Sequence, residues 1–212
     1  MNNINNKLII DFKPISPKDG DLFKNRDPVK VAKELEKAGI LAISVVTEPK
    51  HFGGSLDLLR AVTSAVSLPV LRKDFVKDED DLYQTAECGA KGILLICATI
   101  PKDDIGRLHK KAKILGLHPL VEVHSEEEML LARQIGAEII GINNKNITIL
   151  EKDSGTVDTT LRLIKSAPKD AFIISESGIT CLDDVKKALD CGVNAVLTGT
   201  AFWNGNLPVL PV

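Results

Sequence analysis

The sequence lacks a long apolar segment, a strong charge bias and paired cysteines. Its longest apolar runs, such as Gly92–Ala98, are far too short to cross a membrane. The start, Met1–Lys7, is polar and rich in asparagine, unlike a signal peptide. Lysine and arginine number 27 against 29 aspartates and glutamates, and no basic stripe suits nucleic acid. We therefore expect a soluble, cytoplasmic protein without nucleic-acid or membrane partners.

Cysteine and histidine are both sparse. The cysteines have no CxxC spacing, so we expect a reducing compartment and four small buried side chains. They are Cys88, Cys97, Cys181 and Cys191. The histidines show no metal-ligand spacing, and we expect no metal site. His109 lies in a polar helical segment and is expected to contact solvent, and we expect no catalytic role for His124.

One local pattern recurs along the 212 residues: a helical stretch ends in glycine, and an apolar strand follows almost at once. Glycine suits the left-handed position just past a helix end. The pattern occurs at Gly39, Gly89, Gly116, Gly136 and Gly192. Helix starts are marked too, by Asp27-Pro28 and by the capping box that runs from Ser125 to Glu128. No linker interrupts the alternation, so we expect one domain over residues 1–212.

Eight apolar segments are predicted to be strands, and their near-continuous Val, Ile, Leu and Ala is typical of parallel strands covered on both faces. They are Leu8–Phe12, Leu41–Val46, Pro69–Lys73, Gly92–Ile96, His118–Val123, Glu138–Ile142, Ala171–Glu176 and Asn194–Thr198. Eight strand–helix units predict an α/β fold, a single (β/α)₈ TIM barrel. An open doubly wound sheet is the alternative, but Lys13–Pro17 replaces the Gly-rich turn it needs. Pro208 and Pro211 predict a degenerate eighth helix.

Charged and amide side chains end six of these strands. They are Asp11 with Lys13, Glu48, Lys73, Glu122, Asn143 and Glu176. In a barrel these ends converge on one mouth, and buried charges need a ligand or a pairing network. The lysines suit an anionic substrate. Burial is expected to lower a lysine pKa towards neutrality, which suits a general acid, with a Schiff-base lysine as the alternative.

Two glycine turns indicate where an anion binds. Ser177-Gly178 follows the seventh strand, and Gly199-Thr200 follows the eighth. Barrels commonly bind phosphate at these two loops, where backbone N–H groups point outward. We therefore expect a phosphorylated small-molecule substrate.

Seven segments in order resemble the indole-3-glycerol phosphate synthase family of tryptophan biosynthesis. They are Asp11–Pro17, Ser44–Ser55, Pro69–Phe75, Pro119–Val123, Gly141–Ile147, Ser175–Ile179 and Leu197–Thr200. The resemblance implies a decarboxylating carbon–carbon lyase without a cofactor. Its substrate would be 1-(2-carboxyphenylamino)-1-deoxyribulose 5-phosphate, which loses carbon dioxide and water on ring closure.

The resemblance also implies roles for individual residues. Lys73 would protonate the sugar ketone, Lys13 would hold the substrate carboxylate, and Glu122 would shuttle protons or stabilise the cationic intermediate. The remaining roles are hydroxyl orientation by Asn143, with Glu176 and Ser177 nearby, walls for the aromatic ring from Phe52 and Phe75, and a phosphate cradle of Ser16, Gly178, Gly199 and Thr200.

The sequence departs from the family pattern at two site positions, where Asp11 replaces Glu and Lys145 replaces Arg. The family's N-terminal extension is also expected to be absent. Two alternatives therefore stay open: a related phosphosugar isomerase or aldolase, and a catalytically weak phosphate-binding paralogue. Without a full eighth helix the seam between the eighth and first strands loses cover, which predicts a homodimer unless the apolar tail Phe202–Leu210 covers it.

Overall fold

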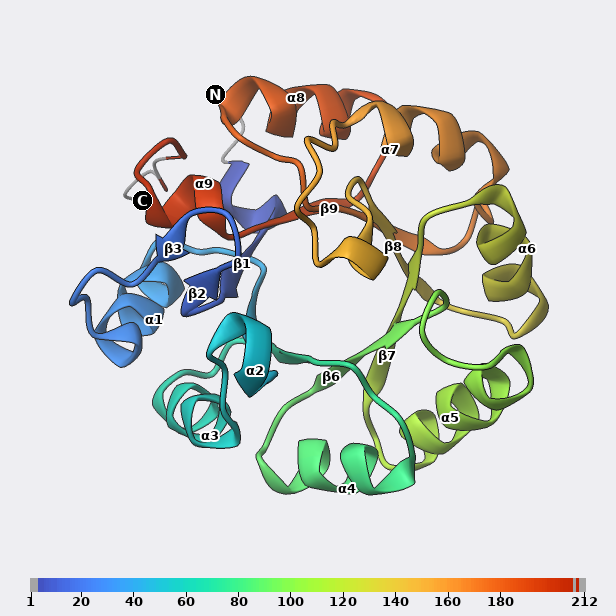
Figure 1. The fold of residues 1–212 in the computed structure, drawn as a ribbon, viewed down its shortest axis with the longest axis horizontal. Coiled ribbons are helices and arrows are strands. Elements are labelled where there is room, and N and C mark those ends of the chain that lie inside the picture. The colour runs from blue at the N-terminus through green and yellow to red at the C-terminus, as the bar shows by residue number, and fades with distance from the viewer. Residues whose placement is uncertain (1–3, 208, 210–212) are drawn as a thin grey trace.

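The computed structural model describes residues 4–207 and 209. Eight parallel strands close into a barrel, each paired with its neighbours along the chain (Figure 1). Their bounds are β1 Leu8–Phe12, β4 Ala42–Val46, β5 Val70–Lys73, β6 Gly92–Ile96, β7 His118–Val123, β8 Ile139–Asn143, β9 Phe172–Glu176 and β10 Ala195–Thr198. β10 pairs with β1 and closes the ring. The predicted TIM barrel is confirmed, and every predicted strand bound lies within one residue.

Helices surround the barrel (Figure 1). The longer ones are α1 Pro28–Lys37, α3 Leu56–Ala65, α4 Glu79–Glu87, α5 Lys102–Ile114, α6 Glu126–Gln134, α7 Asp158–Leu163 and α8 Leu182–Asp190. Short pieces are η1 Ile4–Lys7, α2 Pro49–Phe52, η2 Ile147–Ile149, η3 Ile164–Ser166 and α9 Thr200–Trp203, with a hairpin of β2 Ile15–Ser16 and β3 Gly20–Asp21. Asp27 caps α1 by accepting from the N–H groups of Val29 and Lys30. The five glycines predicted after helices all have positive φ.

The interior of the barrel has an apolar floor beneath a polar mouth. Successive strand side chains point to opposite faces, so residues two apart share one face. Ile9 therefore lies below Asp11, and Leu120 lies below Glu122. The interior apolar cluster contains Ile9, Leu71, Leu94, Ile96, Leu120, Ile147, Ile174, Ala195 and Leu197. This packing leaves the mouth as the place where the interior charges gather.

The eighth helix is degenerate, as predicted, because α9 spans only Thr200–Trp203. Trp203 is buried, packs edge-on against Phe12 at 5.1 Å between ring centroids, and donates its indole N–H to the Asp11 carbonyl. Phe23 and Leu207 join this cover. The seam between β10 and β1 is thus closed by the chain itself, although Pro208 and Leu210 lie outside the described residues. The homodimer stays a prediction, but the uncovered seam that suggested it is not present.

Three expectations about single residues were wrong. Cys181 and Cys191 flank the two ends of α8, where Cys181 is exposed and Cys191 is only partly buried, whereas Cys88 and Cys97 are buried as expected. His109 is buried on the inner face of α5 rather than in solvent. Along residues 4–207 and 209, no helix combines the length and apolar character needed to span a bilayer. The same residues form no cluster of three or more side chains suited to a metal ion.

Candidate active site

Lys73 stands at the centre of the mouth, at the end of β5. Its Nζ lies 3.5 Å from Glu176 Oε2, 3.7 Å from Glu122 Oε2 and 3.9 Å from Glu151 Oε1. Burial alone lowers the pKa of Lys73, but these three carboxylates raise it well above its usual value. The expectation of a lysine pKa near neutrality was therefore wrong, because several negative charges outweigh the loss of solvent.

Glu122 on β7 and Glu176 on β9 form a buried pair next to this ammonium group. Both are fully buried, and their oxygens accept no hydrogen bond from any described residue. Burial, with the nearby Glu122 charge, raises the pKa of Glu176 to about 8. Burial also acts to raise the pKa of Glu122, but Lys73 and His124 hold it below its usual value. At neutral pH the pair therefore offers one base and one acid.

Glu151 is a site residue that the sequence did not reveal. It lies in the turn after η2, where it has a left-handed φ of 56°. Its Oε1 accepts from Ser177 Oγ at 2.7 Å and from Asn143 Nδ2 at 3.4 Å, and its Oε2 lies 3.5 Å from Lys13 Nζ. Burial acts to raise the pKa of Glu151, but Lys73 and Lys13 lower it to about 2. Because Glu151 ends no strand, no pattern in the sequence marked it.

Asp11 and Lys145 are the positions that depart from the family pattern. Asp11 is buried and accepts from Ser44 Oγ at 2.7 Å. Burial raises the pKa of Asp11, opposed by the charges of Lys73 and Lys13. Lys145 donates its Nζ to the Glu151 carbonyl at 3.2 Å, so it braces the turn that carries Glu151.

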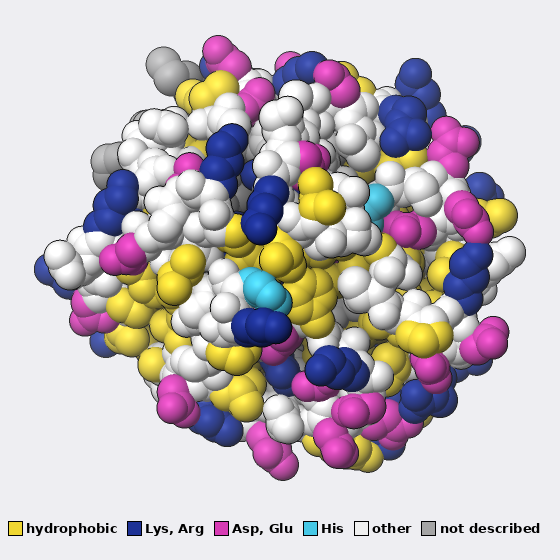
Figure 2. Space-filling view, in the orientation of Figure 1, with side chains coloured by type: hydrophobic (Ala, Val, Ile, Leu, Met, Phe, Trp, Pro, Cys, Tyr) yellow, Lys and Arg dark blue, Asp and Glu magenta, His cyan; other side chains and the backbone are white. Residues whose placement is uncertain are grey.

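Two adjoining cavities open at the mouth. The smaller, about 30 Å³, is largely apolar, and Phe52, Phe75, Leu94, Ile96 and Ile147 are among its walls. The larger, about 300 Å³, is polar and includes Ser177, Gly178, Gly199, Thr200 and Lys145. Asp11, Lys13, Lys73 and Glu151 line both. Figure 2 shows hydrophobic side chains near the middle of this face, with Lys or Arg side chains beside them.

The larger cavity contains most of the predicted phosphate residues. Ser177 and Gly178 both have left-handed φ, 59° and 65°, and a Cβ on Gly178 would lie 2.5 Å from the Gly155 carbonyl oxygen. Only glycine fits there. Ser16 is not among the lining residues, because its hydroxyl donates to Asp19, which lines the cavity instead.

The sequence as a whole matches one family model. That model, described as indole-3-glycerol phosphate synthase, covers residues 2–207. The chain belongs to the indole-3-glycerol phosphate synthase family. Among curated members, the synthase of Thermococcus kodakarensis is 44% identical, over 93% of this chain and 86% of its own length. The synthase of Pyrococcus furiosus is 42% identical, over 96% and 88%. That of Lachnoclostridium phytofermentans is 41% identical, over 94% and 72%.

A solved structure outside the synthase family shares the fold. The N-acetylmannosamine-6-phosphate 2-epimerase of Clostridium perfringens superposes with a TM-score of 0.72 over 94% of this chain and 88% of its own. Its sequence identity is only 16%, so the likeness concerns the barrel alone.

Proposed function

We propose that this chain catalyses the indole-3-glycerol phosphate synthase reaction. The observation that carries the proposal is the charged cluster around Lys73, placed between an apolar cavity and a larger polar one. The substrate, 1-(2-carboxyphenylamino)-1-deoxyribulose 5-phosphate, has matching parts: an aromatic ring, a reacting ketone and a phosphate. The products are indole-3-glycerol phosphate, carbon dioxide and water.

Ring closure begins when the ring carbon that bears the carboxylate attacks the sugar ketone. Lys73 gives a proton to the ketone oxygen as its charge develops, and its raised pKa ensures that the ammonium form is present. The attack leaves positive charge on the ring and its nitrogen, which the Glu122 carboxylate stabilises. The carboxylate then leaves as carbon dioxide, and the electrons of the broken bond return to the ring.

Dehydration then uses the buried pair. Glu176, protonated at neutral pH because its pKa is about 8, gives its proton to the new hydroxyl, which leaves as water. Glu122, the ionised partner, takes the proton from the adjacent ring carbon, and the indole double bond forms. Two protons enter the substrate and one leaves it, which balances the conversion of a carboxylate into neutral carbon dioxide.

Lys13 binds the substrate carboxylate, and Glu151 occupies that place in the free enzyme. Lys13 Nζ pairs with Glu151 Oε2 and lies 5.5 Å from the centre of the Phe52 ring, so it reaches the apolar cavity. Glu151 lines both cavities, and a substrate that spans them must pass it. The incoming carboxylate therefore replaces Glu151 at Lys13, while Asn143 orients the sugar hydroxyls.

Phosphate binds in the larger cavity at Gly178, Gly199 and Thr200, with Ser177 nearby. Backbone N–H groups in such turns stabilise an anion without a positive side chain. Ser16 stays a predicted phosphate ligand, which would require Asp19 to release its hydroxyl. No step in this scheme calls for a cofactor or a metal ion.

The Schiff-base aldolase alternative is disfavoured by the state of Lys73. An imine forms from a neutral amine, whereas the carboxylates around Lys73 hold it as an ammonium ion. A related phosphosugar isomerase and a weak phosphate-binding paralogue are the remaining alternatives, and Asp11 and Lys145 favour the paralogue.

Incubating the chain with the carboxyphenylamino sugar phosphate tests the proposal. Indole fluorescence should appear in step with release of carbon dioxide. Phosphate binding without product would instead establish the paralogue.

The assembly and the compartment remain proposals. Four free cysteines support the cytoplasm. Light scattering over a concentration series tests the predicted homodimer: the mass should double as concentration rises. A constant monomer mass would contradict it, in keeping with Trp203 and Leu207 already covering the seam.

A further inference from the structure

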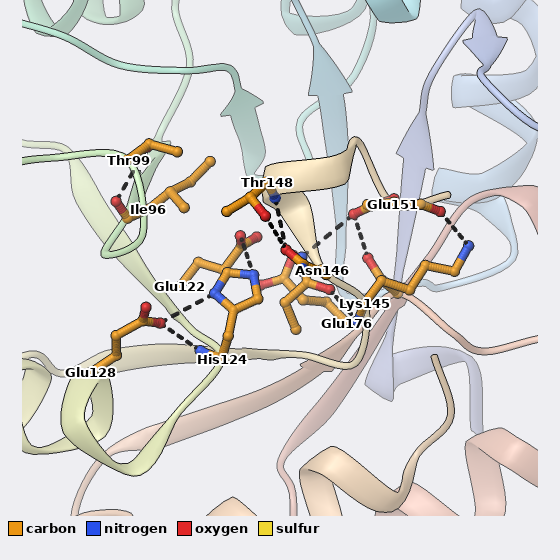
Figure 3. Close-up of polar contacts among 12 residues, drawn as sticks. Ile96, Thr99, Glu122, His124, Glu128, Lys145, Asn146, Thr148, Glu151 and Glu176 are labelled. Carbon is orange, nitrogen blue, oxygen red and sulfur yellow. Dashed lines mark hydrogen bonds and ion pairs between the residues drawn. The ribbon is translucent and has the colours of Figure 1, made fainter. Parts of the chain in front are cut away.

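His124 lies between a carboxylate of the mouth and a carboxylate of the outer helix layer (Figure 3). It follows the last residue of β7, and its backbone N–H donates to Glu128 Oε2 on α6 at 2.7 Å. Its ring Nδ1 lies 3.2 Å from the same oxygen, and its Nε2 lies 3.3 Å from Glu122 Oε1. Nδ1 is within hydrogen-bonding reach of Glu128, and Nε2 is within ion-pair distance of Glu122 without an aligned hydrogen bond. Two carboxylates this near stabilise the doubly protonated imidazolium.

Glu122 and Glu176 share their burial and their distance from Lys73. Both side chains are fully buried, and Lys73 Nζ lies at nearly the same distance from each, 3.7 Å and 3.5 Å. Lys73 therefore cannot decide which of the two is ionised. His124 can, because Glu122 is the member of the pair within ion-pair distance of its ring, whereas its charge is the smallest of the influences on the pKa of Glu176.

The other titratable groups near the pair do not supply this difference. Glu151 adds negative charge near both carboxyls, and Asp11 acts on Lys73. Cys97, which follows β6, stays a neutral thiol because burial and the charges of Glu128 and Glu122 raise its pKa to about 12. His124 is thus the cation that distinguishes Glu122 from Glu176.

We propose that His124, held in place by Glu128, is a positioning residue that makes Glu122 the ionised member of the buried pair and leaves the proton on Glu176. The inference rests on the proposed function in one respect: it assigns the base and the acid of that reaction. Burial acts to lower the pKa of His124, but Glu122 and Glu128 raise it to about 10. The imidazolium therefore persists over the whole working range of pH.

The pH dependence of kcat/KM in His124→Gln tests the proposal. A cation at this distance lowers a carboxyl pKa by about one unit or more, so its removal moves the acid limb to higher pH. Turnover should therefore fall about tenfold on the acid limb and recover as the pH rises, because Glu122 then ionises without help. An equal loss at every pH, or no loss, would overturn the proposal.

Two further variants sharpen this test. Glu128→Gln keeps His124 but removes one of its carboxylate partners, so the acid limb should move in the same direction by a smaller amount. His118→Gln is the matched control, since His118 begins the same strand at the opposite end of the barrel. Its pH profile should follow that of the unchanged chain, and a shift equal to that of His124→Gln would count against a specific role.

Ring-nitrogen NMR separates this proposal from the proposed function. The His124 signal, assigned by its absence in His124→Gln, should stay that of an imidazolium up to about pH 9, given its pKa of about 10. Titration near the ordinary value of about 6.5 would overturn the inference even if indole forms. If the imidazolium persists but no indole forms, the charge on His124 that the inference requires stands and the proposed function fails.

Discussion

Arg72 and Lys73 are neighbours on β5, yet their buried charges are handled in opposite ways. Arg72 points away from the barrel interior towards α4, and each nitrogen of its guanidinium group is hydrogen-bonded. Its partners are Thr47 Oγ1, Asp74 Oδ2, the Asp81 carbonyl and carboxylate, and Thr85 Oγ1. Lys73 points into the mouth and meets its three carboxylates at 3.5–3.9 Å.

The two sites differ in whether the polar groups around the buried charge have all their hydrogen-bond partners. The donors of Arg72 are satisfied, so the guanidinium holds strand and helix together and offers a ligand nothing. Around Lys73, the oxygens of Glu122 and Glu176 have ion-pair partners but accept no hydrogen bond within the described part of the chain. Buried carboxylates without hydrogen bonds are costly unless a ligand or water completes them. Arg72 and Lys73 are both charged and largely buried. What distinguishes the structural role of Arg72 from the proposed functional role of Lys73 is whether the hydrogen-bonding groups around the charge are satisfied.

Lys73→Ala should break the functional half of this comparison. Loss of a positioned acid should reduce turnover about 10²–10⁴-fold while the circular dichroism spectrum stays unchanged. Lys113→Ala is the control, because Lys113 pairs with Glu138 on the surface. Near-parental turnover in Lys73→Ala would refute the role, and borohydride trapping of an adduct on Lys73 would favour the aldolase.

Arg72→Ala should break the structural half. It leaves the Asp74 and Asp81 carboxylates without their buried counter-charge, and the free energy of unfolding in urea should fall by about 3–5 kcal/mol. Turnover per folded molecule should change less than tenfold. Arg107→Ala, which removes exposed ion pairs on α5, should be much milder. A larger loss of unfolding free energy in Arg107→Ala than in Arg72→Ala would contradict the structural role of Arg72.

Gly199→Asp tests whether the larger cavity awaits an anion. A Cβ there would lie 3.1 Å from Asp11 Cβ, and the added negative charge would face the phosphate. Calorimetry should show inorganic phosphate binding at least about tenfold more weakly. Ile114→Asp adds the same charge on an exposed part of α5 and should leave the affinity unchanged. Equal affinity in both variants would argue for a different phosphate site.

Glu151→Gln gives the smallest expected effect, a change in affinity for an aromatic carboxylate. It tests whether the Glu151 charge competes with a ligand for the lysines of the mouth. The amide oxygen can still accept from Ser177, but the charge that pairs with Lys13 and Lys73 is gone. An aromatic carboxylate such as 2-(methylamino)benzoate should therefore bind about three- to tenfold more tightly in calorimetry. Weaker binding would mean that Glu151 holds Lys13 ready for the substrate instead of taking its place.

The strands and most helix ends were predictable because local physics decides them. A glycine past each helix and a run of branched residues in each strand need no distant partner to be recognised. The capping box at Ser125 shows the limit. Ser125 does cap α6, but the Glu128 carboxylate accepts from the N–H of His124 rather than that of Ser125. Because Glu128 accepts from the residue before Ser125, its carboxylate also contacts the His124 ring and holds it in place.

The candidate site was predictable where its residues end strands. Lys73, Glu122, Asn143 and Glu176 converge as expected, because the topology brings strand ends together. Glu151 was missed since its turn folds back over the mouth only in three dimensions. The direction of the Lys73 pKa was also missed, because burial is visible in a sequence while the number of facing carboxylates is not.

The sequence by itself determined the barrel, the end at which the candidate site residues converge and the family to which the chain belongs. These depend on residue types at short spacings and on motifs in a fixed order. Only the tertiary structure decided which buried charge is satisfied and which carboxyl keeps its proton. Electrostatic interaction depends on separations of a few ångströms between distant segments, and packing alone sets those separations.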